Sequence, residues 1–146
     1  MSRGGIFRWF EERREWGAVF VRVLIGFHLV WGTQDNVFSH ARMLEFRDFL
    51  AQTGFPFPLF NAHLSAYAQF LCGILFLVGF AVRPAAVVMI VNFIIALLMV
   101  HTGDTWNGAF PALMMLFGSI FLLFNGAGPL SVDRWLERRG IGLNPG

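Results

Sequence analysis

Four long apolar runs constrain the fold of this chain more than any other feature of its sequence. Each run has 16 to 19 residues, and a helix of about 17 to 25 residues crosses a bilayer core that is about 30 Å thick. In lipid every backbone polar group must be bonded within its own segment, and the runs are too long and too evenly apolar for barrel strands. The sequence therefore predicts an all-α polytopic membrane protein, a single domain whose four transmembrane helices form a bundle. The runs cover residues 17–32, 64–82, 84–101 and 109–124.

The composition favours the same fold and excludes several functions. Of the 146 residues, 56% are hydrophobic, 14% are charged and 18 are Phe. A soluble domain of this length could not bury so much apolar surface, which costs about 25 cal/mol per Å² in water. The arginines lie at the segment ends and form no cationic face, so nucleic-acid binding is disfavoured. The single cysteine, Cys72, excludes both an intramolecular disulfide and a Cys-x-x-Cys redox pair.

The distribution of arginine predicts that both termini are cytoplasmic. Four arginines lie in residues 1–16, Arg83 lies between the second and third runs, and three more lie in the tail. The loop between the first and second runs holds two arginines together with three acids. Cytoplasmic loops are the ones enriched in Arg and Lys. No small-residue cleavage site follows the first run, so we expect that run to be a retained signal anchor.

Two segments outside the runs have the pattern of amphipathic helices. In residues 42–52 apolar and charged residues alternate at helical spacing up to a turn at Gly54, which predicts a helix in the first outer loop. That helix would lie on lipid or cap the bundle. The tail restarts after a Gly-rich break with Ser131 as a helix N-cap. Trp135 and Leu136 would anchor this C-terminal helix at the interface.

Polar residues at membrane depth are costly unless they have a partner, so they are candidates for function. Arg22 lies about 9 Å above Trp16 along a helix, and we expect its side chain to snorkel or to pair with a carbonyl. Asn92 lies nine residues before His101, on the opposite helix face, which predicts a separate contact between helices. Both are therefore interpreted as structural. The polar residues within the runs are Arg22, His28, Gln69, Asn92 and His101.

All four histidines fall in the half of the bundle predicted to be outer. His28, Gln69 and His101 can share one depth, and the neighbouring loop ends supply further polar side chains. We therefore predict an outer polar pocket covered by the first-loop helix. The loop-end residues expected around it are Asp35, Asn61, His63, Asp104, Trp106 and Asn107.

The chemistry of this pocket has several interpretations. Imidazoles could hydrogen-bond a quinone carbonyl, pass protons to the outer phase, or bind a metal or haem iron. The opposing interpretation is that each histidine makes one structural hydrogen bond or marks the interface. No His-x-x-x-His spacing occurs, so no metal site is predicted and quinone ranks ahead of haem or metal.

The ending Gly126-Ala127-Gly128-Pro129-Leu130-Ser131-Val132-Asp133 resembles the Gly-x-Gly-x-x-Ser-x-Asp motif that follows the fourth helix in the DoxX family. These are small bacterial four-helix membrane proteins, and the resemblance extends from about Val19 to Trp135. Further matches occur in the same order along the chain. They are Arg22, Gly26 and Gly32-Thr33-Gln34 in the first run, Gly73 and Gly79-x-x-x-Arg83 around the second, and His101 closing the third.

The resemblance implies a multi-pass protein of the bacterial cytoplasmic membrane that is associated with redox chemistry. Relatives include the DoxD subunit of thiosulfate:quinone oxidoreductase and parts of other membrane oxidoreductase assemblies. This chain has Asp35 where relatives often have Lys, and Gln69 where they often have Glu. The Lys and Glu pair that the resemblance implies is therefore absent from these positions, and His28 is a candidate to replace it.

Three functions follow from these observations. The first is a quinone-linked subunit of a membrane oxidoreductase system, with His28, Gln69 and His101 at the headgroup. The second is a non-catalytic membrane anchor or assembly partner for soluble redox enzymes, and the third is transport of a small solute. The partners expected are the lipid bilayer, soluble or membrane redox proteins and a second copy of the chain. The sequence does not decide whether the chain is itself an enzyme.

Overall fold

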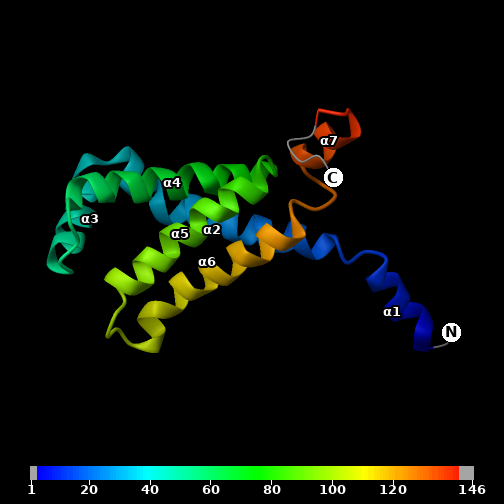
Figure 1. The fold of residues 1–146 in the computed structure, drawn as a ribbon, viewed down its shortest axis with the longest axis horizontal. Helices are drawn as coiled ribbons and strands as arrows, with labels where there is room; N and C mark the ends of the chain where they lie inside the picture. Colours follow the sequence, from blue (N-terminus) through cyan, green and yellow to red (C-terminus); the bar gives the residue numbers. More distant parts are fainter. Residues whose placement is uncertain (1–2, 142–146) are drawn as a thin grey trace.

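The computed structural model describes residues 3–141, which form helices and contain no strand (Figure 1). The all-α fold is therefore confirmed. Four helices, α2, α4, α5 and α6, are long and apolar enough to cross a membrane. The helices are α1 (Arg3–Glu11), α2 (Trp16–Phe38), α3 (His40–Gln52), α4 (Pro58–Val78), α5 (Val82–Met99), α6 (Trp106–Asn125) and α7 (Val132–Arg138).

The four long helices form two pairs. Helix α2 packs most extensively on α4, and α5 packs most extensively on α6, while smaller α4–α5 and α2–α6 contacts join the pairs. Helices α1 and α7 lie at one end of the bundle and α3 lies at the other (Figure 1). We refer to these as the terminal end and the α3 end.

The α2–α4 pair is close because two glycines meet at the crossing. A Cβ on Gly26 would lie 2.8 Å from the carbonyl oxygen of Gly73, and a Cβ on Gly73 would lie 3.0 Å from the carbonyl oxygen of Gly26. Only residues without a side chain allow two backbones to approach this closely. This contact sets the register of α4 against α2, and therefore the height at which their polar residues meet.

Two helices extend beyond the apolar runs that predicted them. Helix α2 continues past Gly32 to Phe38, and α4 begins at Pro58 instead of Leu64. Pro58 suits the first turn of a helix because its fixed φ is helical and its missing N–H needs no partner. At the C-terminal end of α2 the ring of Phe38 packs edge-on against the ring of Phe70, with 5.6 Å between the ring centroids. The helix ends are therefore set by packing and capping, which hydropathy does not report.

The predicted amphipathic helix of the first loop is confirmed as α3, and it caps the bundle. Its buried Met43 and Leu50 pack against Ala62 and Ala66 of α4. Val100, just after α5, packs against the same cluster. Helix α3 therefore packs on α4 and α2, and the residue that follows α5 reaches the same cluster.

At the terminal end, residues 126–133, which we call the clasp, hold the turn between α4 and α5. The turn has two residues with positive φ, Gly79 at 73° and Ala81 at 48°. The Asp133 carboxylate accepts hydrogen bonds from the backbone N–H of Ala81 (2.8 Å) and Val82 (3.0 Å). The N–H of Asp133 donates to the carbonyl of Gly79 at 2.9 Å. An aspartate from the end of the chain thus caps the N-terminus of α5.

The clasp also provides the partner of the buried arginine in α2. Arg22 is 2% exposed, and its Nη2 donates to the carbonyl oxygen of Leu130 at 2.6 Å. Of the two expectations for this side chain, the carbonyl pair is therefore observed and snorkelling is not. Ser131 begins α7 as predicted, with its Oγ accepting from Arg134 N–H at 3.2 Å.

Candidate functional site

A cavity of about 340 Å³ lies inside the α3 end of the bundle. All four long helices and α3 contribute to its wall, so it is a feature of the whole fold. Its volume is within the range of small-molecule pockets, about 300 to 1,000 Å³. Most of the wall is apolar, including Phe93, Ala112 and Met115. The polar residues that line it are His28, Thr33, Asn61, Ser65, Gln69, Asn92 and His101.

Three of the predicted site residues therefore line one cavity. His28 comes from α2, Gln69 from α4 and His101 from the turn after α5. The side chain of His28 makes no hydrogen bond within residues 3–141, so its ring nitrogens are available to a ligand in the cavity. Helix α3 contributes Phe46, Phe49 and Leu50 to the wall, as expected for a helix that covers the pocket.

Of the six predicted loop-end residues, Asn61 also lines the cavity, whereas Asp35, His63, Asp104, Trp106 and Asn107 do not. His63 points its Nδ1 at the carbonyl oxygen of Leu59 (2.9 Å) and stacks on Tyr67. Asp35 is exposed near the end of α2, and Trp106 is exposed at the start of α6, where its ring packs on Phe110.

A chain of hydrogen bonds crosses the cavity wall from α4 to α5. Ser65 Oγ donates to Asn92 Oδ1 at 2.9 Å, and Gln69 Nε2 donates to Ser65 Oγ at 2.9 Å. We call these three residues the polar ladder. Gln69 Oε1 and Asn92 Nδ2 have no partner among the described residues 3–141. The ladder thus leaves one carbonyl oxygen, from Gln69, and one NH₂ group, from Asn92, unpaired among residues that line the cavity.

Asn92 makes a contact between helices as expected, but the expectation that this contact lies apart from the site is wrong, because Asn92 lines the cavity together with His101. That expectation came from measuring helical spacing back from His101. Helix α5 ends at Met99, and the N–H of His101 instead bonds the carbonyl of Ala96 at 3.2 Å. Because His101 lies outside the helix, its direction is independent of the helical register of Asn92.

Ser65 is a polar cavity residue that the sequence analysis did not single out. A lone serine in an apolar run is unremarkable, since its hydroxyl usually bonds a carbonyl of its own helix. A usable signal was present, because Ser65 and Gln69 are four residues apart and so share a helix face.

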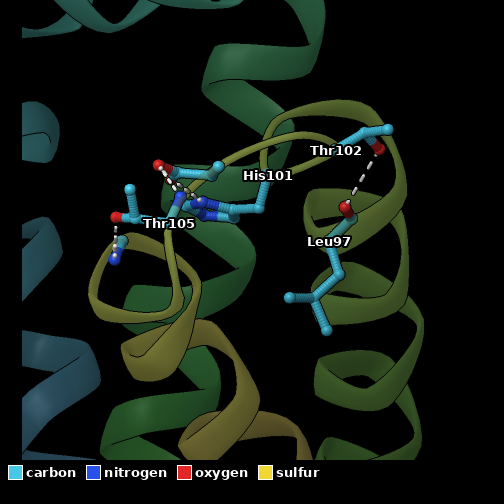
Figure 2. A network of polar contacts seen from close by, with 6 residues as sticks. Leu97, His101, Thr102 and Thr105 are labelled. Carbon is cyan, nitrogen blue, oxygen red and sulfur yellow. Dashed lines mark hydrogen bonds and ion pairs between the residues drawn. The ribbon is translucent and has the colours of Figure 1, made fainter.

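The carboxylate of Asp104 bonds the ring of His101, which lines the cavity. Figure 2 shows the turn that carries His101. His101 Nδ1 lies 3.0 Å from Asp104 Oδ2, and the N–H of Thr105 donates to Asp104 Oδ1 at 2.7 Å. The hydrogen bond from His101 and then that from Thr105 hold the pKa of Asp104 below its usual range. The carboxylate is therefore ionised at neutral pH, and it accepts the hydrogen bond that orients the imidazole.

The turn that carries this pair is fixed by hydroxyl groups. Thr102 follows the last turn of α5, and its Oγ1 donates to the carbonyl oxygens of Leu97 (Figure 2) and Leu98. Thr105 caps the N-terminus of α6 by accepting from Gly108 N–H at 3.4 Å. His101 Nε2, the second ring nitrogen, has no hydrogen-bond partner in the part of the chain that the structure describes.

Metal binding has no geometric support in residues 3–141. No group of three His, Cys, Asp or Glu side chains lies close enough there to hold an ion. Cys72 is buried in the apolar core and does not line the cavity. The arrangement is instead that of a pocket with a few directed polar groups in an apolar wall.

Comparison with known proteins identifies the family. The sequence model of the DoxX family matches residues 17–102, more than half of the chain. A relative described as the uncharacterized membrane protein Rv3486 of Mycobacterium tuberculosis is 32% identical over 100 residues, which cover 59% of this chain and 61% of that protein. The match thus spans about three fifths of the length of this relative. No solved structure matches this sequence. With four membrane-spanning helices and this family match, the chain belongs to the DoxX family of membrane proteins.

Proposed function

We propose that this chain is a quinone-linked subunit of a membrane oxidoreductase system, and that the cavity at the α3 end binds the quinone headgroup. The observation that carries this proposal is the set of unpaired polar groups, from His28, His101 and the polar ladder, that faces an otherwise apolar cavity of about 340 Å³. A quinone headgroup is a flat apolar ring with two carbonyl acceptors. It needs this combination of an apolar wall and a few directed donors.

Each polar residue has a distinct part in this proposal. Asn92 Nδ2 and a ring N–H of His28 supply donors, and the hydrogen bonds along the ladder hold Asn92 and Gln69 in fixed rotamers. Apolar residues such as Phe93 and Met115 exclude water from the headgroup. A bound quinone would supply two-electron, two-proton chemistry. The electrons would come from a soluble or membrane redox protein, a partner that the resemblance to oxidoreductase subunits implies.

His101 and Asp104 are suited to carry protons between the cavity and the adjoining aqueous phase. His101 accepts a proton at Nε2 while its Nδ1–H remains bonded to Asp104. The ionised carboxylate stabilises the resulting imidazolium. The two residues lie in the α5–α6 turn, where His101 lines the cavity and Asp104 is exposed.

The proposal places the α3 end on the outer face of a bacterial cytoplasmic membrane, and this orientation is testable. The excess of arginine at the terminal end supports it. A reporter that is active only outside the cytoplasm should be active when inserted after Gly54 and inactive when fused after residue 141. The reverse pattern would rule out an outer proton route.

Loss of bound quinone in two histidine variants is the main test. The protein is purified in mild detergent, extracted with organic solvent, and the extract is measured by absorbance for quinone and for haem. Wild type should retain quinone, and His28→Ala and His101→Ala should each weaken its binding roughly 3- to 10-fold, as expected for one lost hydrogen bond. His63→Ala is the matched control, because His63 does not line the cavity.

A different result would identify the alternative function. Quinone-free wild type that co-purifies with soluble redox enzymes would indicate a membrane anchor or assembly partner. Equal losses of bound quinone in His63→Ala and His28→Ala would contradict a headgroup site at this cavity, because of these two histidines only His28 lines it.

A further inference from the structure

The wall of the cavity is apolar and exposed at the seam between α4 and α5. Leu64 of α4 and Ile95 of α5 both line the cavity, and both are exposed on the surface of the bundle, 56% and 43% respectively. The cavity is only partly enclosed, so apolar side chains that line it and are also exposed lie where an opening toward lipid is possible.

The polar ladder locates this opening within the seam. Leu64 is adjacent to Ser65, and Ile95 lies three residues after Asn92, toward the α3 end. Ser65 and Asn92 are bonded across the seam, so they close it on the side of the terminal end. On the other side Phe49 of α3 lines the cavity and is 47% exposed. Three apolar side chains from three helices therefore frame the opening.

The opposite seam, between α2 and α6, has a different character. Helix α2 meets α6 where Ile25 lies against Gly118, and the exposed residues that line the cavity on that side are His28, Gly32 and Pro111. These are polar or small. An aliphatic chain would find more apolar contact between Leu64 and Ile95.

Resting on the quinone function above, we propose that the opening framed by Phe49, Leu64 and Ile95, the α4–α5 portal, admits the ligand from the bilayer and holds its tail. The ligand class is therefore an amphiphile, a carbonyl-bearing ring attached to a long hydrocarbon chain. The ring bonds to the polar groups inside, and the chain leaves between the two helices into lipid. The α3 end of the cavity does not offer such a route, because Met43 and Leu50 of α3 are packed there against α4.

The test compares two probes on variants of the portal. One probe is a benzoquinone that carries only methyl and methoxy groups, and the other is the same ring with a decyl chain. Binding is measured on the full chain in lipid nanodiscs. Leu64→Trp should weaken binding of the decyl probe by roughly tenfold, since bulk fills the path of the chain, and should change binding of the short probe by less than about twofold. Leu71→Trp is the matched control, because Leu71 is similarly exposed on the same helix but does not line the cavity.

Each outcome decides the proposal. The portal is overturned if Leu64→Trp weakens binding of both probes equally, or of neither probe. In either case the decyl chain would not pass between Leu64 and Ile95. If Leu64→Trp does not reconstitute, Ile95→Phe narrows the portal from α5 and is judged by the same comparison. Failure of wild type to bind either probe would instead refute the quinone function itself.

Discussion

Gly79→Ala is expected to destabilise the protein by roughly 2 to 5 kcal/mol, from left-handed strain and overpacking together. Gly79 ends α4 at φ 73°, a conformation that disfavours a side chain. A Cβ at this position would overlap Nη1 of Arg22 and lie 2.6 Å from Cβ of Ser131. Arg22 cannot move aside freely, because it is buried and bonded to Leu130.

The measurement is unfolding of the purified protein in detergent by added denaturant, followed by circular dichroism. Gly54→Ala is the matched control, because Gly54 has a φ of 76° just after α3 but has nothing within 4 Å of its Cβ position. The control should therefore show only the strain, about 1 to 2 kcal/mol. Equal losses in the two variants would mean that the clasp yields to the added methyl group.

Asp133→Ala is expected to release the clasp from the α4–α5 turn and to cost about 3 kcal/mol. The reason is that two backbone donors at the start of α5, Ala81 and Val82, lose a charged acceptor, and such bonds contribute about 1.5 to 3 kcal/mol each without full additivity. The buried guanidinium of Arg22 also loses a nearby negative charge. Asp133→Asn keeps one acceptor but turns an NH₂ group toward the second donor, so we expect a smaller loss.

Hydrogen exchange provides the local measurement for this prediction. The amides of Ala81 and Val82 should exchange faster in Asp133→Ala, and protease should cleave residues 126–131 more readily. Asp48→Ala is the control, because the Asp48 carboxylate is exposed and is bonded by its neighbour Arg47. If Asp133→Ala is no less stable than Asp48→Ala, the aspartate does not hold the turn.

The clasp explains the closing motif of the chain in physical terms. Gly128 has a φ of 79°, and a Cβ there would lie 3.0 Å from the carbonyl oxygen of Glu15. Ser131 caps α7, and Asp133 caps α5. The motif residues therefore fasten the last segment across α2 and α5. The N-cap role of Ser131 was predicted, whereas the partner of Asp133 was not, because 51 residues separate Asp133 from Val82.

The sequence predicted the depth of the site residues in the bundle, but it did not predict which side chains face the cavity. The number of residues from a helix end gives depth, and this was sufficient to bring His28, Gln69 and His101 together. The same reasoning could not distinguish them from Asp35 and His63, which lie at a similar depth. Whether a side chain faces the cavity depends on how each helix is rotated against its neighbours.

The linear order of residues was enough to predict an all-α chain with four membrane-crossing helices, an amphipathic α3, and histidines gathered toward one end. These properties reside in single segments, since apolar length and periodicity do not depend on neighbours. Tertiary packing alone determined the Ser65–Asn92 bond, the carbonyl partner of Arg22, and the aspartate that caps α5. Each joins segments whose relative rotation and height are set by close contacts such as Gly26 on Gly73, and no single segment carries that information.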